Sequence, residues 1–129
     1  MLLLIALNDK GQVPVGSGAL IAEDADGSVV GYALYWPIYD TETGGPLMFL
    51  SDLLVEEDWR GRGLALDLMG TIAREAVAAG HRGMLWEVLR QNARARAFYR
   101  RMAEESDDAI VVNCAHDEFR RLAAEGVPV

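Results

Sequence analysis

The segment from Val55 to Ala65 most constrains how this chain folds, because the hydrophobic pattern changes its period there. Before it, Leu47 to Val55 is an almost continuous apolar run, which is typical of a strand inside a sheet. After it, apolar residues recur every three or four positions and predict a helix from Leu64 to Ala79; they are Leu64, Leu68, Met69, Ile72, Ala76 and Val77. Between strand and helix, Gly61 and Gly63 allow a sharp turn of the backbone.

This glycine turn has the chemistry of an anion site. The start of the predicted helix presents unpaired N–H groups and the positive end of the helix dipole. Gly61 and Gly63 would let the backbone approach a ligand without interference from a Cβ atom. Arg60 and Arg62 add positive charge. The combination predicts a cradle for a pyrophosphate group.

Three phosphate-binding patterns compete for this turn. A nucleoside-triphosphate loop ends in Lys followed by Ser or Thr, where this chain has Leu64–Ala65. A dinucleotide fingerprint needs a third small residue where Leu66 stands, although Glu87 lies near the distance expected of a ribose-binding acid. A dinucleotide-dependent oxidoreductase therefore stays open as a distant alternative. The third pattern is Arg-x-x-Gly-x-Ala, formed by Arg60, Gly63 and Ala65.

The remaining elements predict a mixed α/β layer. Ala19–Ala22 and Val29–Trp36 indicate a hairpin that Pro37 stops. Met1–Asn8 is either a short strand or the end of a helix. The other expected elements, in chain order, are a loop at Tyr39–Pro46, a left-handed helix cap at Gly80, a strand at Met84–Leu89, a helix from Asn92 to about Met102 and a strand at Ile110–Cys114.

In these surroundings the third pattern resembles the acyl-CoA pyrophosphate loop of the GNAT superfamily of N-acetyltransferases. In that superfamily the loop follows the central strand and opens the long helix, and a strand and a second helix with Asn and Phe-Tyr follow. Here Leu85–Leu89 matches that strand, and Asn92 to Tyr99 matches the start of that helix. The resemblance covers about Leu20 to Ala123. It implies one α/β (α+β) domain over residues 1–129, with a mixed, mostly antiparallel sheet flanked by helices.

The resemblance also implies which residues bind acetyl-CoA, the expected cosubstrate. Main-chain groups of the strand Leu53, Leu54 and Val55 would run beside the pantetheine. Backbone N–H groups of the loop would hold the pyrophosphate; the loop residues are Arg60, Gly61, Arg62, Gly63, Leu64 and Ala65. Asn92 would bind the pantetheine arm or cap its helix. Tyr99 would act as the acid that protonates the departing thiolate.

Features of the acceptor side resemble the polyamine (diamine) acetyltransferase branch. They are Tyr35–Pro37, Tyr39–Thr41 and Phe49–Val55. Two departures concern the acceptor: the branch usually has Glu-Asp where this chain has Ser51–Asp52, and the strand and helices that normally precede Ala19 are almost entirely missing. Asp52 is the candidate for receiving or relaying the proton of the amine.

Charge is segregated along the chain, whose net charge is −8. Residues 1–58 carry a net charge of −9, residues 60–101 carry +6 and residues 102–129 carry −5. This pattern favours an anionic ligand on the middle and a small cationic amine near the acidic part, and it disfavours nucleic acid.

The few cysteine and histidine residues limit which cellular compartment, disulfides and metal sites are expected. The single Cys114, expected to be buried, excludes an internal disulfide framework and indicates a reducing compartment. His81 and His116 lie too far apart in sequence for a metal signature, so no metal is expected. Met1–Leu7 is far shorter than the ~20 residues of a membrane span and lacks a basic leader. The expected location is the cytoplasm, without a membrane partner.

Two functions remain open at this stage. The first is an N-acetyltransferase that moves the acetyl group directly to a primary amine. The second is a non-catalytic CoA-binding or regulatory module that lacks its acceptor wall. A homodimer would supply that wall from its partner and preserve catalysis.

Overall fold

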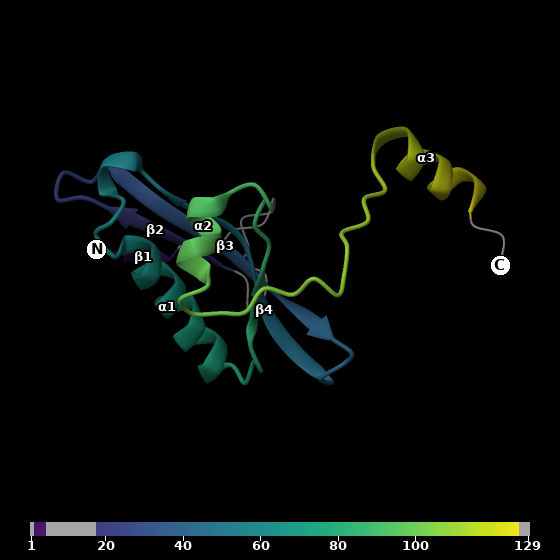
Figure 1. Ribbon diagram of the computed structural model, residues 1–129, viewed down its shortest axis with the longest axis horizontal. Coiled ribbons are helices and arrows are strands. Elements are labelled where there is room, and N and C mark those ends of the chain that lie inside the picture. The colour runs from purple at the N-terminus through teal and green to yellow at the C-terminus, as the bar shows by residue number, and fades with distance from the viewer. Residues whose placement is uncertain (1, 5–17, 127–129) are drawn as a thin grey trace. The chain divides into compact units, whose positions relative to one another are not determined.

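The computed structural model describes residues 2–4 and 18–126, which form two compact units, residues 1–88 and 89–129 (Figure 1). The elements of the first unit are β1 (Leu2–Leu4), β2 (Gly18–Glu23), β3 (Val29–Asp40), β4 (Gly45–Val55), the 3₁₀ turn η1 (Glu57–Trp59), α1 (Leu64–Ala78) and β5 (Met84–Trp86). The second unit holds α2 (Ala93–Tyr99) and α3 (His116–Glu125). In the described part of the chain, no helix has the length and apolar character needed to cross a membrane.

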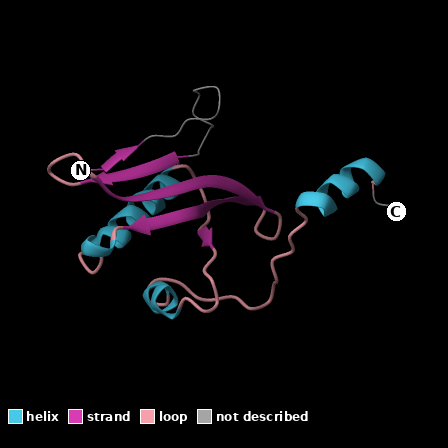
Figure 2. Cartoon of the chain, turned by 90° about the horizontal axis from the view of Figure 1, so that it is seen from above, coloured by secondary structure: helices cyan, strands magenta, loops and turns pink. Residues whose placement is uncertain are grey.

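The strands form one five-stranded sheet in the order β1-β2-β3-β4-β5 (Figure 2). Neighbours are antiparallel except β5, which runs parallel to β4. The predicted mixed, mostly antiparallel sheet is therefore confirmed. β1 shows that Leu2–Leu4 is a strand; the rest of the ambiguous N-terminal segment, and most of the region before Ala19, lies outside the described residues.

The β3–β4 hairpin is longer than the sequence predicted. The expectation that Pro37 stops the strand is wrong, because β3 continues to Asp40. Pro37 pairs with Met48 of β4 but lies beyond Tyr35, the last β3 residue that pairs with β2 in the described part of the chain. A residue without an N–H group is tolerated where one strand edge has no partner. The expected loop at 39–46 shrinks to a turn over residues 41–44.

The core lies between one face of the sheet and α1 (Figure 2). The sheet contributes the buried Leu20, Ala22, Ala33, Tyr35, Met48 and Leu50, and α1 contributes Leu68, Met69, Ile72 and Ala76. The helical stripe was predicted correctly except at Val77, which is 75% exposed. Gly80, at φ +81°, caps α1 as expected, since its N–H donates to Val77 O and the N–H of His81 donates to Ala76 O.

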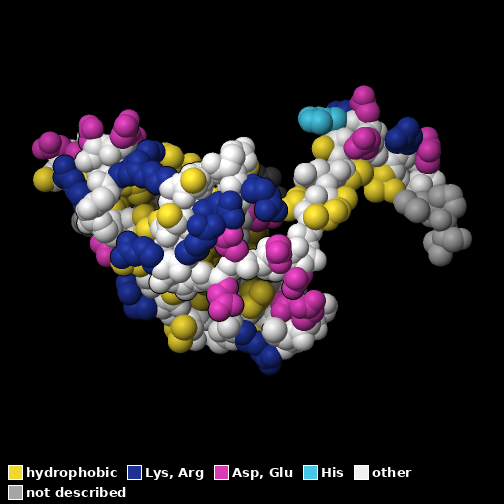
Figure 3. Space-filling model, in the orientation of Figure 1, with side chains coloured by type: hydrophobic (Ala, Val, Ile, Leu, Met, Phe, Trp, Pro, Cys, Tyr) yellow, Lys and Arg dark blue, Asp and Glu magenta, His cyan; other side chains and the backbone are white. Residues whose placement is uncertain are grey.

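Four predictions for the later part of the chain are wrong. β5 stops at Trp86 rather than Leu89, because its ladder with β4 spans only three pairs. α2 ends at Tyr99 rather than near Met102. Residues 110–114 form no strand, since no described strand pairs with them, and Cys114 is exposed rather than buried. Helix α3 was not predicted; it and the segment before it display hydrophobic side chains on the surface (Figure 3).

Candidate functional site

Strands β4 and β5 separate at the centre of the sheet. They pair only from Met48↔Met84 to Leu50↔Trp86, whereas β4 continues to Val55. Ser51 is an extra residue at this point, because the β3 ladder passes from Leu50 directly to Asp52. Such a bulge bends the strand that carries it. In the described part of the chain, no strand pairs with residues 53–55 on the β5 side, so this edge offers main-chain groups to an extended ligand.

The loop after β4 exposes a row of backbone donors. Gly61 and Gly63 have φ angles of +75° and +82°, and no other atom lies within 4 Å of a Cβ built on either residue. Gly63 caps α1 without a side-chain hydrogen bond. No oxygen of the described residues accepts a hydrogen bond from the N–H groups of residues 61–66. The predicted anion cradle is therefore open and has unpaired donors.

Both loop arginines are held by the loop itself. Arg60 Nε donates a 3.1 Å hydrogen bond to Val55 O, which joins the loop to the end of β4. Arg62 Cζ lies 4.8 Å from the centre of the Trp59 ring, within the range of a cation–π contact. From the sequence, Trp59 is expected to be a packing residue; its three-residue spacing from Arg62 was the available signal for this contact. Positive charge is thus fixed on both sides of Gly61.

A glycine outside the loop sets the position of the helix that follows the loop. A Cβ at Gly31 would lie 3.0 Å from Leu54 O and 3.2 Å from Leu64 Cδ2. The missing side chain lets the first turn of α1 approach β3 and β4. Sequence reasoning missed this residue, although a glycine within a β-branched and aromatic run indicates close backbone approach.

The strand residues predicted to bind CoA divide between two faces of the sheet. Leu53 and Val55 pair with Ala33 and Gly31, and Gly31 faces α1. Side chains alternate along a strand, so Asp52 and Leu54 lie on the opposite face. Asp52 is exposed and needs no buried partner. Its proposed proton transfer depends on its position rather than on burial.

One acid expected near the acceptor, Asp40, makes hydrogen bonds within the β3–β4 turn. The carboxylate of Asp40 accepts hydrogen bonds from Thr43 Oγ1 at 2.6 Å and from the N–H groups of Thr43 and Glu42. The hydrogen bonds from Thr43, and more weakly the charge of Arg82, lower the pKa of Asp40. Arg82 Nη1 donates to the carbonyl of Thr43. The carboxylate of Asp40 therefore stabilises the turn.

The remaining predicted residues, Asn92 and Tyr99, belong to the second unit. Asn92 caps α2 as expected, since its Oδ1 accepts a 3.2 Å hydrogen bond from the N–H of Ala95. Tyr99 ends α2, its ring centre lies 5.4 Å from that of Phe98, and burial raises its pKa. Their approach to the loop stays a prediction.

Comparison with known proteins links this chain to one family. The model of the Acetyltransferase (GNAT) family matches residues 7–103. An integron cassette protein from the mobile metagenome of V. cholerae has a similar structure, with a TM-score of 0.77 and 25% identity over 84% of this chain and 67% of its own.

Two further solved structures share the fold. A ribosomal-protein-alanine N-acetyltransferase from Brucella melitensis biovar Abortus 2308 has a TM-score of 0.69 and 20% identity, over 88% of this chain and 98% of its own. An aminoglycoside N-acetyltransferase, AAC(6')-Iy, solved with CoA, has a TM-score of 0.69 and 23% identity, over 80% of this chain and 78% of its own.

Proposed function

This chain belongs to the acetyltransferase (GNAT) family and is an acetyl-CoA-dependent N-acetyltransferase, and we propose that its acceptor is a small cationic or polyamine-like primary amine. The observation that supports acetyl-CoA binding is the open row of N–H donors at residues 61–66, beside the unpaired end of β4, and the acidic charge around Asp52 is what supports a cationic acceptor. This arrangement suits the pyrophosphate and pantetheine of acetyl-CoA.

The residues fit acetyl-CoA in three places. The N–H groups of residues 61–65 hold the pyrophosphate, whereas the N–H of Arg60 donates to Glu57 O at 3.1 Å, so Arg60 contributes through its charge. Arg62 adds charge from its position over Trp59. Leu53 and Val55 offer main-chain groups to the pantetheine amides, whereas Leu54, the alternate residue between them, directs its main-chain groups toward Tyr32 of β3. Val55 O already accepts from Arg60, so the N–H of Val55 is the group that remains for this work. Asn92 contributes to the pantetheine arm in addition to its cap.

Transfer proceeds directly, without a covalent enzyme intermediate. The amine nitrogen attacks the thioester carbonyl, a C–N bond forms and the C–S bond breaks. Asp52 receives the amine proton, directly or through water, and Tyr99 donates its phenolic proton to the CoA thiolate. The raised pKa of Tyr99 keeps the phenol protonated, the form that an acid needs.

The acidic first part of the chain supports a cationic acceptor. Residues 1–58 carry a net charge of −9, and the exposed Asp52 lies on β4 near the bulge. Such a field raises the local concentration of a cation and speeds its association. With Asp40 held by its turn, Asp52 is the acid best placed to contact the amine.

The test measures release of free thiol from acetyl-CoA with spermidine, lysine, an aminoglycoside and a peptide amino terminus, at low and moderate salt. We expect the highest kcat/KM for the polycation, decreasing as salt rises. Asp52→Asn should lower kcat/KM for that amine, whereas Asp26→Asn, which removes an exposed acid of the β2–β3 turn, should not. Equal use of a neutral acceptor, insensitive to salt and to Asp52→Asn, would overturn the proposed acceptor.

A further inference from the structure

Helix α2 is too short to hold its two proposed functional residues by itself. It spans only Ala93–Tyr99, and none of its residues is fully buried. Isolated helices of this length are unstable, because nucleation costs more than the few hydrogen bonds return. Asn92 stabilises the first turn. A second interaction must fix the last turn, which carries Tyr99.

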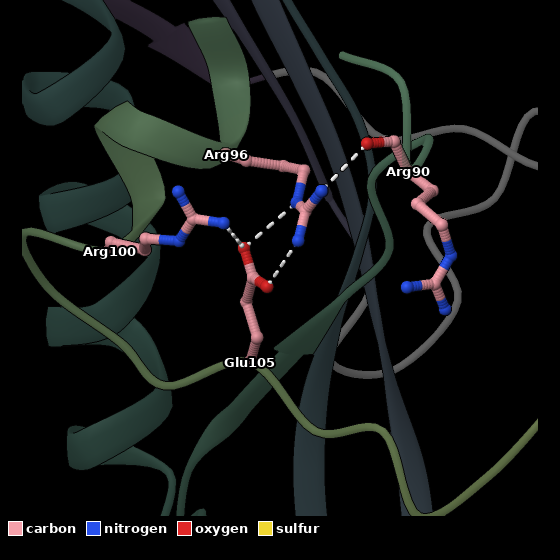
Figure 4. A network of polar contacts seen from close by, with 4 residues as sticks. All are labelled: Arg90, Arg96, Arg100 and Glu105. Carbon is pink, nitrogen blue, oxygen red and sulfur yellow. Dashed lines mark hydrogen bonds and ion pairs between the residues drawn. The ribbon is translucent and has the colours of Figure 1, made fainter. Parts of the chain in front are cut away.

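That interaction is an ion-pair network around Glu105 (Figure 4). Arg96 Nε donates to Glu105 Oε1 at 3.0 Å, and Arg96 Nη2 donates to Oε2 at 2.7 Å, so the pair is bidentate. Arg100 Nη2 lies 3.0 Å from Oε1 of the same carboxylate. Arg96 Nη1 also donates a 2.8 Å hydrogen bond to Arg90 O. One guanidinium therefore joins the segment before α2, the helix itself and the segment after it.

The network closes a turn that starts on the backbone of Tyr99. The N–H groups of Met102 and Ala103 both donate to Tyr99 O at 3.0 Å. The chain then reaches Glu105, whose carboxylate returns to Arg96 and Arg100. These arginines are four positions apart, so they lie on one side of the helix with Tyr99 next to the second. The turn therefore connects the backbone of Tyr99 to the ion-pair network.

We propose that Arg96 and Glu105 are positioning residues that fix Tyr99 for proton transfer to the CoA thiolate. The inference rests on the proposed role of Tyr99. A bidentate arginine–carboxylate pair suits this work because its planar geometry restricts both partners, which a single-point contact does not. Misplacement of an acid by about 1 Å costs on the order of 100-fold in rate.

The network keeps its charges at neutral pH. The hydrogen bonds from Arg96, together with the charges of Arg100 and Arg96, lower the pKa of Glu105. The same carboxylate raises the pKa of Arg96. Protonation of Glu105 would therefore break the closure only in acid.

The test compares Glu105→Gln and Arg96→Lys with wild type. Both should lower kcat at least 10-fold, while the KM for acetyl-CoA changes less than about twofold. Glu105→Asp, which keeps the charge, should recover part of the loss. Glu104→Gln is the matched control and should change neither constant. A second readout is the NMR signal of the Tyr99 ring, which Glu105→Gln should shift while Glu104→Gln leaves it in place.

A double-variant cycle shows whether Glu105 acts through Tyr99. Adding Glu105→Gln to Tyr99→Phe should cause no further loss of kcat beyond that of Tyr99→Phe alone. Additive losses, or wild-type kcat in both single variants, would overturn the inference while leaving acetyl transfer intact. Absence of turnover in the wild type, by contrast, would overturn the proposed function.

Discussion

The hydroxyl of Tyr35 on β3 donates a 2.6 Å hydrogen bond to Glu75 Oε2 on α1. Tyr35 is fully buried, so this bond ties the helix that follows the loop to the centre of the sheet. The two residues are 40 positions apart in the sequence, so no local pattern indicates the bond. The bond fixes the direction of α1, whose first turn forms the cradle.

Replacing Tyr35 by Phe should destabilise the fold. The change leaves the partly buried carboxylate of Glu75 without its donor, and losing a hydrogen bond to a charged group costs about 1.5–3 kcal/mol. We expect the free energy of unfolding in urea to fall by about that amount. Tyr39→Phe, at a side chain that is 70% exposed, is the control and should leave it unchanged. Equal stability of the two variants would contradict a structural role for the bond.

The same residue predicts a loss of stability in alkali. Burial, and then the hydrogen bond and charge of Glu75, raise the pKa of Tyr35 well above its ordinary value. A tyrosine in the unfolded chain loses its proton near pH 10, whereas Tyr35 in the folded protein keeps it. Above about pH 10 the folded state therefore binds more protons, and stability decreases as pH rises. Urea unfolding between pH 8 and 11 should show this decrease, and Tyr35→Phe should weaken it.

Gly63 tests the cradle directly. Gly63 has a φ of +82° and open space around it, so a side chain added there would meet no protein atom but would occupy the space that the proposed pyrophosphate needs. Gly63→Val should leave the chain folded and weaken CoA binding at least 10-fold, as measured by calorimetry. Gly44→Val is a matched control, because Gly44 also has a positive φ and open space but lies in the turn at the other end of the β3–β4 hairpin. It carries similar backbone strain and should not change CoA affinity.

Sequence reasoning succeeded where a local pattern determines the structure. The strand that ends at Val55, the glycine loop and the helix from Leu64 each depend on residues near in sequence, and all three are present. It failed at residues 110–114, because a run of β-branched residues becomes a strand only when a partner strand is available.

The contacts that hold the candidate site were harder to predict. Arg60 donates a hydrogen bond to a backbone carbonyl, and Arg62 stacks on Trp59. Arg96 pairs with Glu105 and not with its neighbour Glu104. Charge counting assigned these arginines to a basic region but could not identify their partners, since each pairing depends on how the backbone turns.

Arg60 should contribute to CoA binding more than to stability. Its bond to Val55 O holds the loop at the end of β4, and its positive charge belongs to the residue that precedes the glycine turn. Arg60→Gln should raise the CoA dissociation constant about 3- to 10-fold and reduce the dependence of binding on salt, because one positive charge is removed. The free energy of unfolding should change by less than about 0.5 kcal/mol, since the side chain is exposed.

Arg74→Gln, which removes an exposed arginine of α1 that bonds Thr71, is the control and should leave both the affinity and its salt dependence unchanged. Equal effects of the two changes on CoA binding would indicate a general influence of net charge and would contradict a specific role for Arg60.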